Sequence, residues 1–211
     1  MVLPAEGFLR LGHSFLHWEG EDRPEPGDRV VDLGPARTRL EAWFAAGGRL
    51  GVQAISPLAE HPLEKLRDHA LVAGGPAAAL PGLCALAYGF GRVVLALPPE
   101  DREAFAACVR ASRPVGEALV VDSLVDAPPR PPHHRALLGC AGIAPRPETI
   151  ETLRRLLRPD GQLVLFGLPA AEVRGVFEKL AHDGLSLRGS GFHGDLAYLA
   201  GLQEHPTVLP A

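Results

Sequence analysis

Residues 92–123 read RVVLALPPEDREAFAACVRASRPVGEALVVDS and indicate the fold class more clearly than any other part of the chain. The apolar, β-branched run at 92–98 predicts a buried strand. Residues 99–112 predict a helix with two acids in its first turn, where they suit the helix dipole. A second apolar run at 117–123 predicts another strand. A strand, a helix and a strand at this spacing form a βαβ unit, whose two strands run parallel.

The same alternation continues on both sides of this unit. Further strands are predicted at 29–34, 50–55, 68–74, 135–140, 162–168 and 185–192, and helices at 36–48, 62–67, 147–158, 170–183 and 195–202. Near-continuous apolar strands must be buried on both faces, which requires helices on both sides of a sheet. The sequence therefore predicts a Rossmann-like α/β fold, with a mostly parallel sheet covered by helices and one or two sub-domains.

The chain divides into four predicted parts. These are a capping segment at 1–28, a Rossmann-like αβ domain at 29–123, a proline-rich linker at 124–134 and a second αβ part at 135–211. Apolar residues between Phe8 and Trp18 predict a short helix in the capping segment. Residues 91–123 and 134–168 share a strand, a helix, an Arg-Pro-x-Gly turn and a strand. This shared pattern fits either an internal duplication or the general similarity of αβ units.

Two prolines predict local interruptions. Pro81 lies within residues 76–89, which therefore predict either a helix or a loop broken at that proline. Pro159, Asp160 and Gly161 together predict a turn that precedes the strand at 162–168.

Composition and charge limit the classes of function. The 211 residues are enough for one large or two small domains, and the net charge of −4 argues against a surface that coats nucleic acid. No apolar run reaches the length of a membrane span, and three widely separated cysteines favour neither a disulfide framework nor a zinc ribbon. We therefore expect a cytoplasmic protein that binds no metal, acts on a small-molecule or protein acceptor and is able to form a homo-oligomer.

The segment PGDRVVDLG (26–34) resembles the first motif of class I S-adenosylmethionine-dependent methyltransferases. In that family, glycines after the first strand let the backbone pass close to the cofactor, and an acid at the end of the second strand holds the ribose hydroxyls. Carried over to this sequence, the resemblance implies a cofactor site for S-adenosylmethionine. Its candidate residues, at the ends of the strands predicted at 29–34 and 50–55, are Asp32, Gly34, Gln53 and Ser56.

The sequence departs from the family pattern at several positions. Ala36 and Thr38 replace the second and third glycines, and no acid follows residues 50–55. Gly74 and Gly75 stand where the family often has the acid that meets the adenine. The resemblance therefore implies a divergent methyltransferase-like protein with an eroded cofactor site, and no catalytic residue is assigned.

Two other functions compete with this one. Residues 153–169 resemble a helix, turn and strand of the methyltransferases and equally the last third of medium-chain dehydrogenases. Residues 185–202 resemble the dehydrogenases, which implies a relative that uses NAD(P). No GxGxxG follows a predicted strand, however, and the strand at 92–98 leads into Pro98-Pro99-Glu100-Asp101. Prolines and acids there exclude and repel a pyrophosphate, so we expect nicotinamide cofactors to bind poorly. The third alternative is a noncatalytic Rossmann-like module that binds a protein partner.

Other chemically reactive side chains carry weaker hypotheses. His193 and Asp195 follow a predicted strand and suit acid–base chemistry, although Asp195 equally suits a helix N-cap. Cys140 follows a strand, but no feature of the sequence lowers the pKa of its thiol. Adjacent His133 and His134 have no accompanying carboxylate motif and fit a solvated loop.

Overall fold

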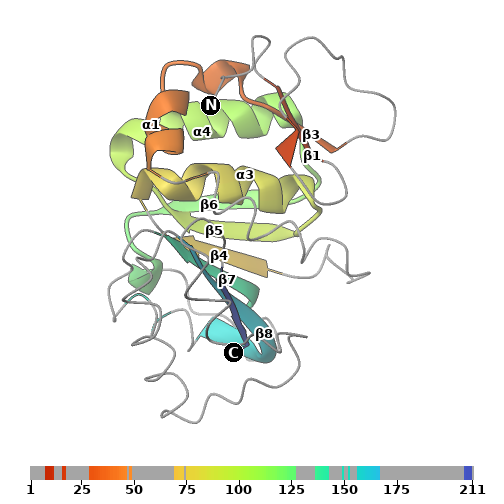
Figure 1. The fold of residues 1–211 in the computed structure, drawn as a ribbon, viewed down its shortest axis with the longest axis vertical. Coiled ribbons are helices and arrows are strands. Elements are labelled where there is room, and N and C mark those ends of the chain that lie inside the picture. Colours follow the sequence, from red (N-terminus) through yellow and green to blue (C-terminus); the bar gives the residue numbers. More distant parts are fainter. Residues whose placement is uncertain are drawn as a thin grey trace.

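The computed structural model describes residues 8–11, 16–17, 29–46, 48, 69–73, 75–126, 136–142, 149, 152, 156–166 and 207–210. Two sheets and the helices that accompany them make up this part of the chain (Figure 1). The predictions for residues 50–55, 62–67, 170–183, 185–192 and 195–202 lie outside the described residues.

The larger sheet has six strands in the order β6-β5-β4-β7-β8-β9. Its members are β4 (His69–Ala73), β5 (Arg92–Ala96), β6 (Glu117–Val121), β7 (Ala136–Gly142), β8 (Leu157–Phe166) and β9 (Thr207–Pro210). Neighbouring strands from β6 to β8 pair in parallel, and β9 pairs antiparallel with β8. The predicted Rossmann-like α/β fold is confirmed. Strands from both predicted αβ parts join one sheet, because β4 pairs with β7.

The direction in which strands are added reverses at β4. From β4 the chain adds β5 and then β6 on one side, and it then returns to add β7 and β8 on the other side. In an open α/β sheet, ligands bind outside the carboxyl ends of the strands at such a reversal. The topology therefore predicts a ligand site at the carboxyl ends of β4 and its neighbours.

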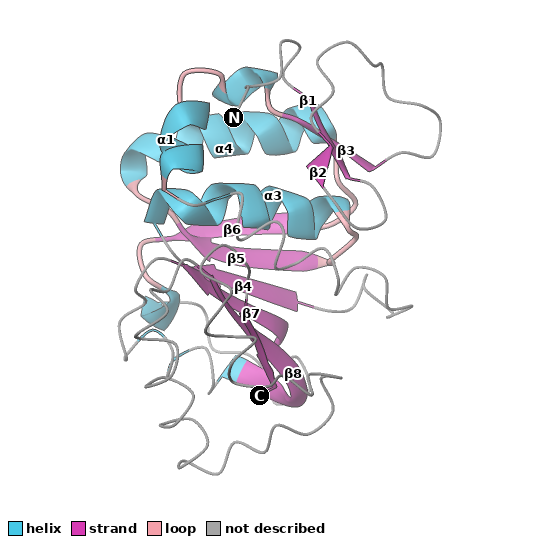
Figure 2. Cartoon of the chain, viewed as in Figure 1, coloured by secondary structure: helices cyan, strands magenta, loops and turns pink. Residues whose placement is uncertain are grey.

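The N-terminal part of the chain forms a separate three-stranded sheet, in the order β2-β1-β3. Its strands are β1 (Phe8–Leu11), β2 (Leu16–His17) and β3 (Arg29–Asp32). The helix predicted between Phe8 and Trp18 is wrong, because residues 8–11 pair with β3 as an antiparallel strand. The parallel pairing predicted for 29–34 is also wrong, since the described partner of β3 is β1. This sheet contacts the helices α3 and α4 through β3 (Figure 2).

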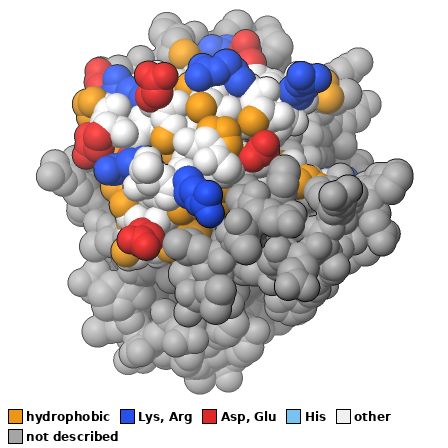
Figure 3. Space-filling model, turned by 90° about the horizontal axis from the view of Figure 1, so that it is seen from above, with side chains coloured by type: hydrophobic (Ala, Val, Ile, Leu, Met, Phe, Trp, Pro, Cys, Tyr) orange, Lys and Arg blue, Asp and Glu red, His pale blue; other side chains and the backbone are white. Residues whose placement is uncertain are grey.

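The helices with bounds in the described part of the chain include α1 (Leu40–Ala45), α3 (Ala79–Ala87) and α4 (Pro99–Ser112). α3 packs against β4 and β5 of the larger sheet, and α4 packs against α3. Residues 79–86 of α3 are all buried, because this helix lies between β4, β5 and α4. Pro81 does not break α3, since it stands in the first turn, where the missing N–H has no intrahelical partner. Arginines, acids and apolar side chains intermingle on the described surface seen from above (Figure 3).

The turn predicted at Pro159-Asp160-Gly161 falls within β8 as an irregularity in strand pairing. Ala136 of β7 pairs with Leu157, whereas Leu138 already pairs with Gln162. Residues 158–161 therefore oppose a single residue of β7, and this extra length contains the Pro-Asp-Gly sequence. The helix predicted to continue to residue 158 is wrong at its end, because β8 begins at Leu157.

Among the residues that the structure describes, no helix has the length and apolar character needed to cross a bilayer.

Candidate functional site

Gly75 is the first described residue after the carboxyl end of β4. Its φ of +57° lies in the left-handed region, which glycine adopts at little cost. Among the described residues, no atom beyond those of its chain neighbours lies within 4 Å of the position that a Cβ would occupy there. The short 3-10 helix η4 (Gly75–Ala78) follows and leads directly into α3. The backbone at the reversal of the sheet is therefore open to close approach by a ligand.

An arginine of α4 bridges the carboxyl ends of the next two strands. Arg102 donates from Nε and Nη2 to the carbonyl oxygen of Leu97, at 3.1 Å in each case. Its Nη2 also donates to the carboxylate of Asp122, which directly follows β6. The Asp122 side chain is 81% exposed, so it remains accessible to a ligand from solvent. Asp122 is an exposed carboxylate at this edge of the sheet, as is Glu100 in the first turn of α4.

Asp101 lies in the first turn of α4 but does not face solvent. Its side chain is fully buried, and Oδ1 accepts hydrogen bonds from Nε of Arg39 at 2.7 Å and from Nε1 of Trp43 at 2.9 Å. The hydrogen bond to Asp101 raises the pKa of Arg39 above its ordinary value, against the lowering effect of burial. This carboxylate joins α4 to α1 and is not free to hold the hydroxyl groups of a cofactor.

The predicted site residues Asp32 and Gly34 lie at the end of β3. The Asp32 carboxylate accepts a hydrogen bond from the Gly34 N–H at 2.9 Å, and the Asp32 N–H donates to Oγ of Ser112 at 2.9 Å. Ser112 is the last residue of α4, and a helix of 14 residues is about 20 Å long. Asp32 thus lies beside the far end of α4 from Pro99, away from the carboxyl edge of the larger sheet.

The structure describes two of the four predicted cofactor residues, Asp32 and Gly34. Gln53 and Ser56 lie outside the described residues, and the Asp32 carboxylate accepts a local hydrogen bond that orders the turn into the short helix η1 (Gly34–Ala36). A role for Asp32, Gly34, Gln53 and Ser56 in cofactor binding stays a prediction.

Sequence reasoning missed Gly75 and Asp122. The sequence carried a signal for both residues. ALVAGG (70–75) is an apolar run that ends in glycines before a helix, and Asp122 is the last residue but one of the strand predicted at 117–123. The run at 29–34 has the same local form and was interpreted as the first strand of the parallel sheet.

Two cysteines are buried in the helical layer. The pKa of the Cys108 thiol is raised to about 12, because burial and the nearby Asp32 carboxylate outweigh the lowering effect of a hydrogen bond with the Ala36 backbone. Burial alone raises the pKa of the Cys84 thiol. Cys140 lies within β7. Within the described residues, no group of three His, Cys, Asp or Glu side chains is placed to hold a metal ion.

We expect the stability of the protein to fall as pH rises above about 9. In the unfolded chain a thiol loses its proton near pH 8.5, whereas Cys108 keeps its proton in the folded state up to about pH 12. The unfolded state therefore binds fewer protons over this range, so the free energy of unfolding decreases with pH. Urea unfolding at pH 8, 9 and 10 measures the slope. The Cys108→Ala variant should show a shallower slope, and an equal slope would contradict this assignment.

Comparison with known proteins gives no sequence relative but does give structural ones. No family model matches the chain, and no curated protein matches it. The ribosomal protein L11 methylase of Lactobacillus delbrueckii subsp. bulgaricus is similar in structure, with a TM-score of 0.50 and 18% identity over 64% of this chain and 67% of that chain.

Two further structures give lower scores. A precorrin 8w decarboxylase of Methanobacterium thermoautotrophicum has a TM-score of 0.44 and 14% identity, over 62% of this chain and 77% of that one. The O-methyltransferase TomG of Streptomyces achromogenes, in complex with SAM, has a TM-score of 0.37 and 18% identity, over 76% and 74%. Of these three, the L11 methylase bears on the fold. The chain has a methyltransferase-like Rossmann fold, and identity at this level shows the fold alone.

Proposed function

We propose that this protein is a divergent methyltransferase-like protein that binds S-adenosylmethionine at the carboxyl edge of its larger sheet. The observation that carries the proposal is the backbone at Gly75. It follows the strand at which the sheet reverses, it adopts a left-handed conformation, and no other described residue fills the position of a Cβ there. This is the position at which an open α/β sheet receives a ligand.

The residues of this edge fit part of such a cofactor. The peptide groups around Gly75 suit its methionine part, because the absence of a side chain permits close approach. The Asp122 carboxylate is exposed and suits a hydroxyl or amino group. When bound, the cofactor would supply an electrophilic methyl group, and the protein's part is to position an acceptor in line with it. We assign no general base, and the acceptor is a small molecule or a macromolecule.

The site is nonetheless sparse, which supports the eroded cofactor site inferred from the sequence. β5 ends at Ala96 and is followed by Leu97 and Pro98, with no acid at the position where the family holds the ribose. The next acid that is buried, Asp101, is held by Arg39 and Trp43. We therefore expect weaker binding than a site with two free carboxylates would give.

We expect Gly75→Val to weaken binding of S-adenosylmethionine by about 10-fold or more, which corresponds to ~1.4 kcal/mol. A β-branched side chain would occupy the space that the cofactor needs and would strain the left-handed backbone. Gly89→Val is the matched control, because Gly89 has a φ of +93°, also has open space, and stands at the opposite end of α3. Titration calorimetry on the wild type and both variants gives the comparison. Equal losses in the two variants would point to strain alone and would contradict the site.

We expect Asp122→Ala to weaken binding by about 10-fold, since a hydrogen bond to a charged group contributes about 1.5–3 kcal/mol. Asp32→Ala tests the placement at 26–34 that the sequence resemblance implied. A loss in Asp32→Ala with normal affinity in Asp122→Ala would move the cofactor site to the end of β3 and overturn the proposal. Both carboxylates are partly or largely exposed, so neither variant should fail to fold.

Titration of the same protein with NADH and NADPH tests the two alternative functions. The N-terminus of α4 begins with two prolines and carries Glu100 on its surface, which disfavours a pyrophosphate. A micromolar dissociation constant for NADH or NADPH would favour the dehydrogenase relative. Absence of binding by S-adenosylmethionine and by both nicotinamides would favour a noncatalytic module that binds a protein partner.

A further inference from the structure

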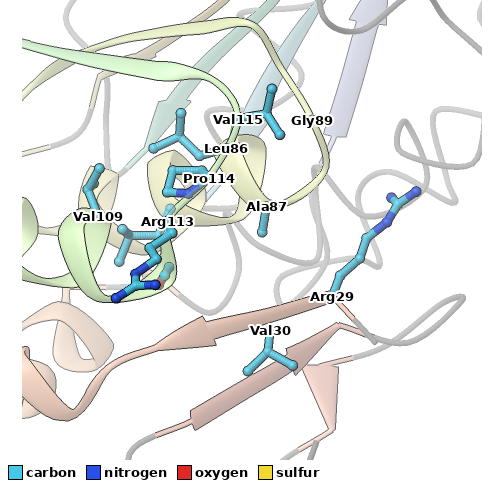
Figure 4. A pocket seen from close by; sticks show the side chains of 11 residues that line it. Arg29, Val30, Leu86, Ala87, Gly89, Val109, Arg113, Pro114 and Val115 are labelled. Carbon is cyan, nitrogen blue, oxygen red and sulfur yellow. The ribbon is translucent and has the colours of Figure 1, made fainter. Parts of the chain in front are cut away.

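A cavity of about 260 Å³ lies at the opposite edge of the helical layer from the proposed cofactor site. It is formed where α3 and α4 end and where β3 passes beside them (Figure 4). Apolar side chains of all three elements line it, among them Val30, Leu86 and Val109. Known cavities for drug-sized ligands measure about 300–1,000 Å³, so this one suits a smaller molecule.

The charged side chains that line this cavity are both positive. Arg29 belongs to β3 and Arg113 follows α4, and their guanidinium groups lie on opposite sides of the cavity (Figure 4). Among the described residues that line it there is no carboxylate. Arg29 also lies over the ring of Tyr88, with its guanidinium carbon 5.4 Å from the ring centroid. The nearest acid along β3 is Asp32, whose carboxylate already accepts the Gly34 N–H. An apolar cavity with two cations at its rim is complementary to an anion that carries an apolar chain.

The backbone at Arg113 provides a second observation. It is the C-cap of α4 and adopts the left-handed conformation, with φ 47° and ψ 52°. Among the described residues it is the one non-glycine residue with a positive φ. Glycine or asparagine normally stands at such a position, because other side chains strain the backbone there. Strained residues of this kind cluster at ligand sites, where the side chain has a role that offsets the strain.

We propose that this cavity binds a small aliphatic carboxylate, with its chain against Leu86 and Val109 and its carboxylate at Arg113. Val115, whose side chain is 84% exposed at the rim, extends the apolar lining outwards. The cavity lies beside the ends of α3 and α4 that are remote from Gly75 and Pro99. The inference therefore does not depend on the proposed function.

Hexanoate is the probe for this site, and hexylamine and hexan-1-ol are its positive and neutral counterparts. Titration of the full chain should show hexanoate binding at least 10-fold more tightly than either of them. Raising the ionic strength should weaken hexanoate binding, because salt screens the arginines at the rim. Equal affinities for hexanoate and hexylamine, or no binding of hexanoate, would overturn the proposal.

The Arg113→Gly variant separates ligand binding from folding. Glycine relieves the left-handed strain, so the midpoint of thermal unfolding should stay the same or rise, while hexanoate binding should weaken about 10-fold. Arg113→Lys should keep most of the affinity, because the positive charge remains. If Arg113→Gly binds hexanoate as the wild type does, Arg113 plays no part and the proposal is wrong.

A charge placed at the rim provides an independent control. Val115→Glu should weaken hexanoate binding by repulsion and should not disturb folding, because the side chain is 84% exposed. Val125→Glu introduces the same charge at a residue that is 65% exposed and follows β6 at the other edge of the sheet. Hexanoate affinity should fall in Val115→Glu and remain unchanged in Val125→Glu. Equal affinities in the two variants would contradict this location.

Discussion

The Asp101→Ala variant should unfold with a free energy about 3 kcal/mol or more below that of the wild type. The carboxylate is fully buried and accepts hydrogen bonds from Arg39 and Trp43. Its removal leaves the indole N–H of Trp43, which is also fully buried, without its acceptor. The substitution also removes the hydrogen bonds that join the first turn of α4 to Arg39 and Trp43. Small domains have only about 5–15 kcal/mol of stability in total, so this loss is large.

Three further variants separate the contributions of the Trp43 hydrogen bond, the Asp101 charge and the Arg39 cation to the free energy of unfolding. Trp43→Phe removes one donor and keeps most of the buried ring, so we expect a loss of about 1–2 kcal/mol. Asp101→Asn keeps an acceptor at the same place but loses the charge that faces Arg39. Arg39→Met leaves the buried carboxylate without its cation, and its oxygen Oδ2 already accepts no hydrogen bond from the described residues.

Urea unfolding followed by tryptophan fluorescence and by circular dichroism measures all four variants. The effects of Arg39→Met and Asp101→Asn should not add, because the two residues share one interaction. A loss below about 1 kcal/mol in Asp101→Ala would show that the site reorganises and would contradict the structure at this point.

Gly116→Ala should also lower the free energy of unfolding by about 3 kcal/mol. A Cβ at this residue would lie 2.0 Å from the carbonyl oxygen of Phe90 and 3.1 Å from its carbonyl carbon. Both atoms belong to the backbone, so relief requires the start of β6 to move away from β5. That movement would also stretch the hydrogen bond from the Glu117 N–H to the Gly91 carbonyl, which is 3.0 Å long.

Gly82→Ala is the matched control for a steric effect of this kind. A Cβ at Gly82 would lie 2.8 Å from Cδ1 of Leu95, which is the end of a side chain and can turn aside. Alanine also favours the helix interior by about 1 kcal/mol over glycine. We expect the free energy of unfolding to change by less than about 1 kcal/mol. Similar losses in Gly82→Ala and Gly116→Ala would mean that the backbone contact at Phe90 is not the cause.

The elements predicted most accurately are those whose local pattern and burial agree. Residues 92–98 were predicted as a strand and residues 99–112 as a helix, and the structure has β5 at Arg92–Ala96 and α4 at Pro99–Ser112. Apolar β-branched residues are buried on both faces of a central parallel strand, and the acids of the first turn suit the start of a helix. These causes act within a few residues, so the sequence reveals them.

The N-terminal part was predicted less well, because its structure depends on pairing between distant residues. The apolar run at 29–34 has the local form of a parallel strand, but β3 pairs antiparallel with residues 8–11. A short apolar run does not specify its partner, since strands of either kind have similar composition. The assignment of the first methyltransferase motif to 26–34 depended on that partner.

The sequence by itself determined the fold class, the strands and helix of residues 92–121 and the two prolines and two acids that follow β5. Only the tertiary structure decided which strand lies at the reversal of the sheet, and with it that Gly75 and Asp122 lie at its carboxyl edge. It also decided that the acid at 101 is buried against Arg39 and Trp43 whereas the acid at 122 is exposed. The physical reason is that strand order and burial arise from contacts between segments far apart in the chain, which local periodicity does not contain.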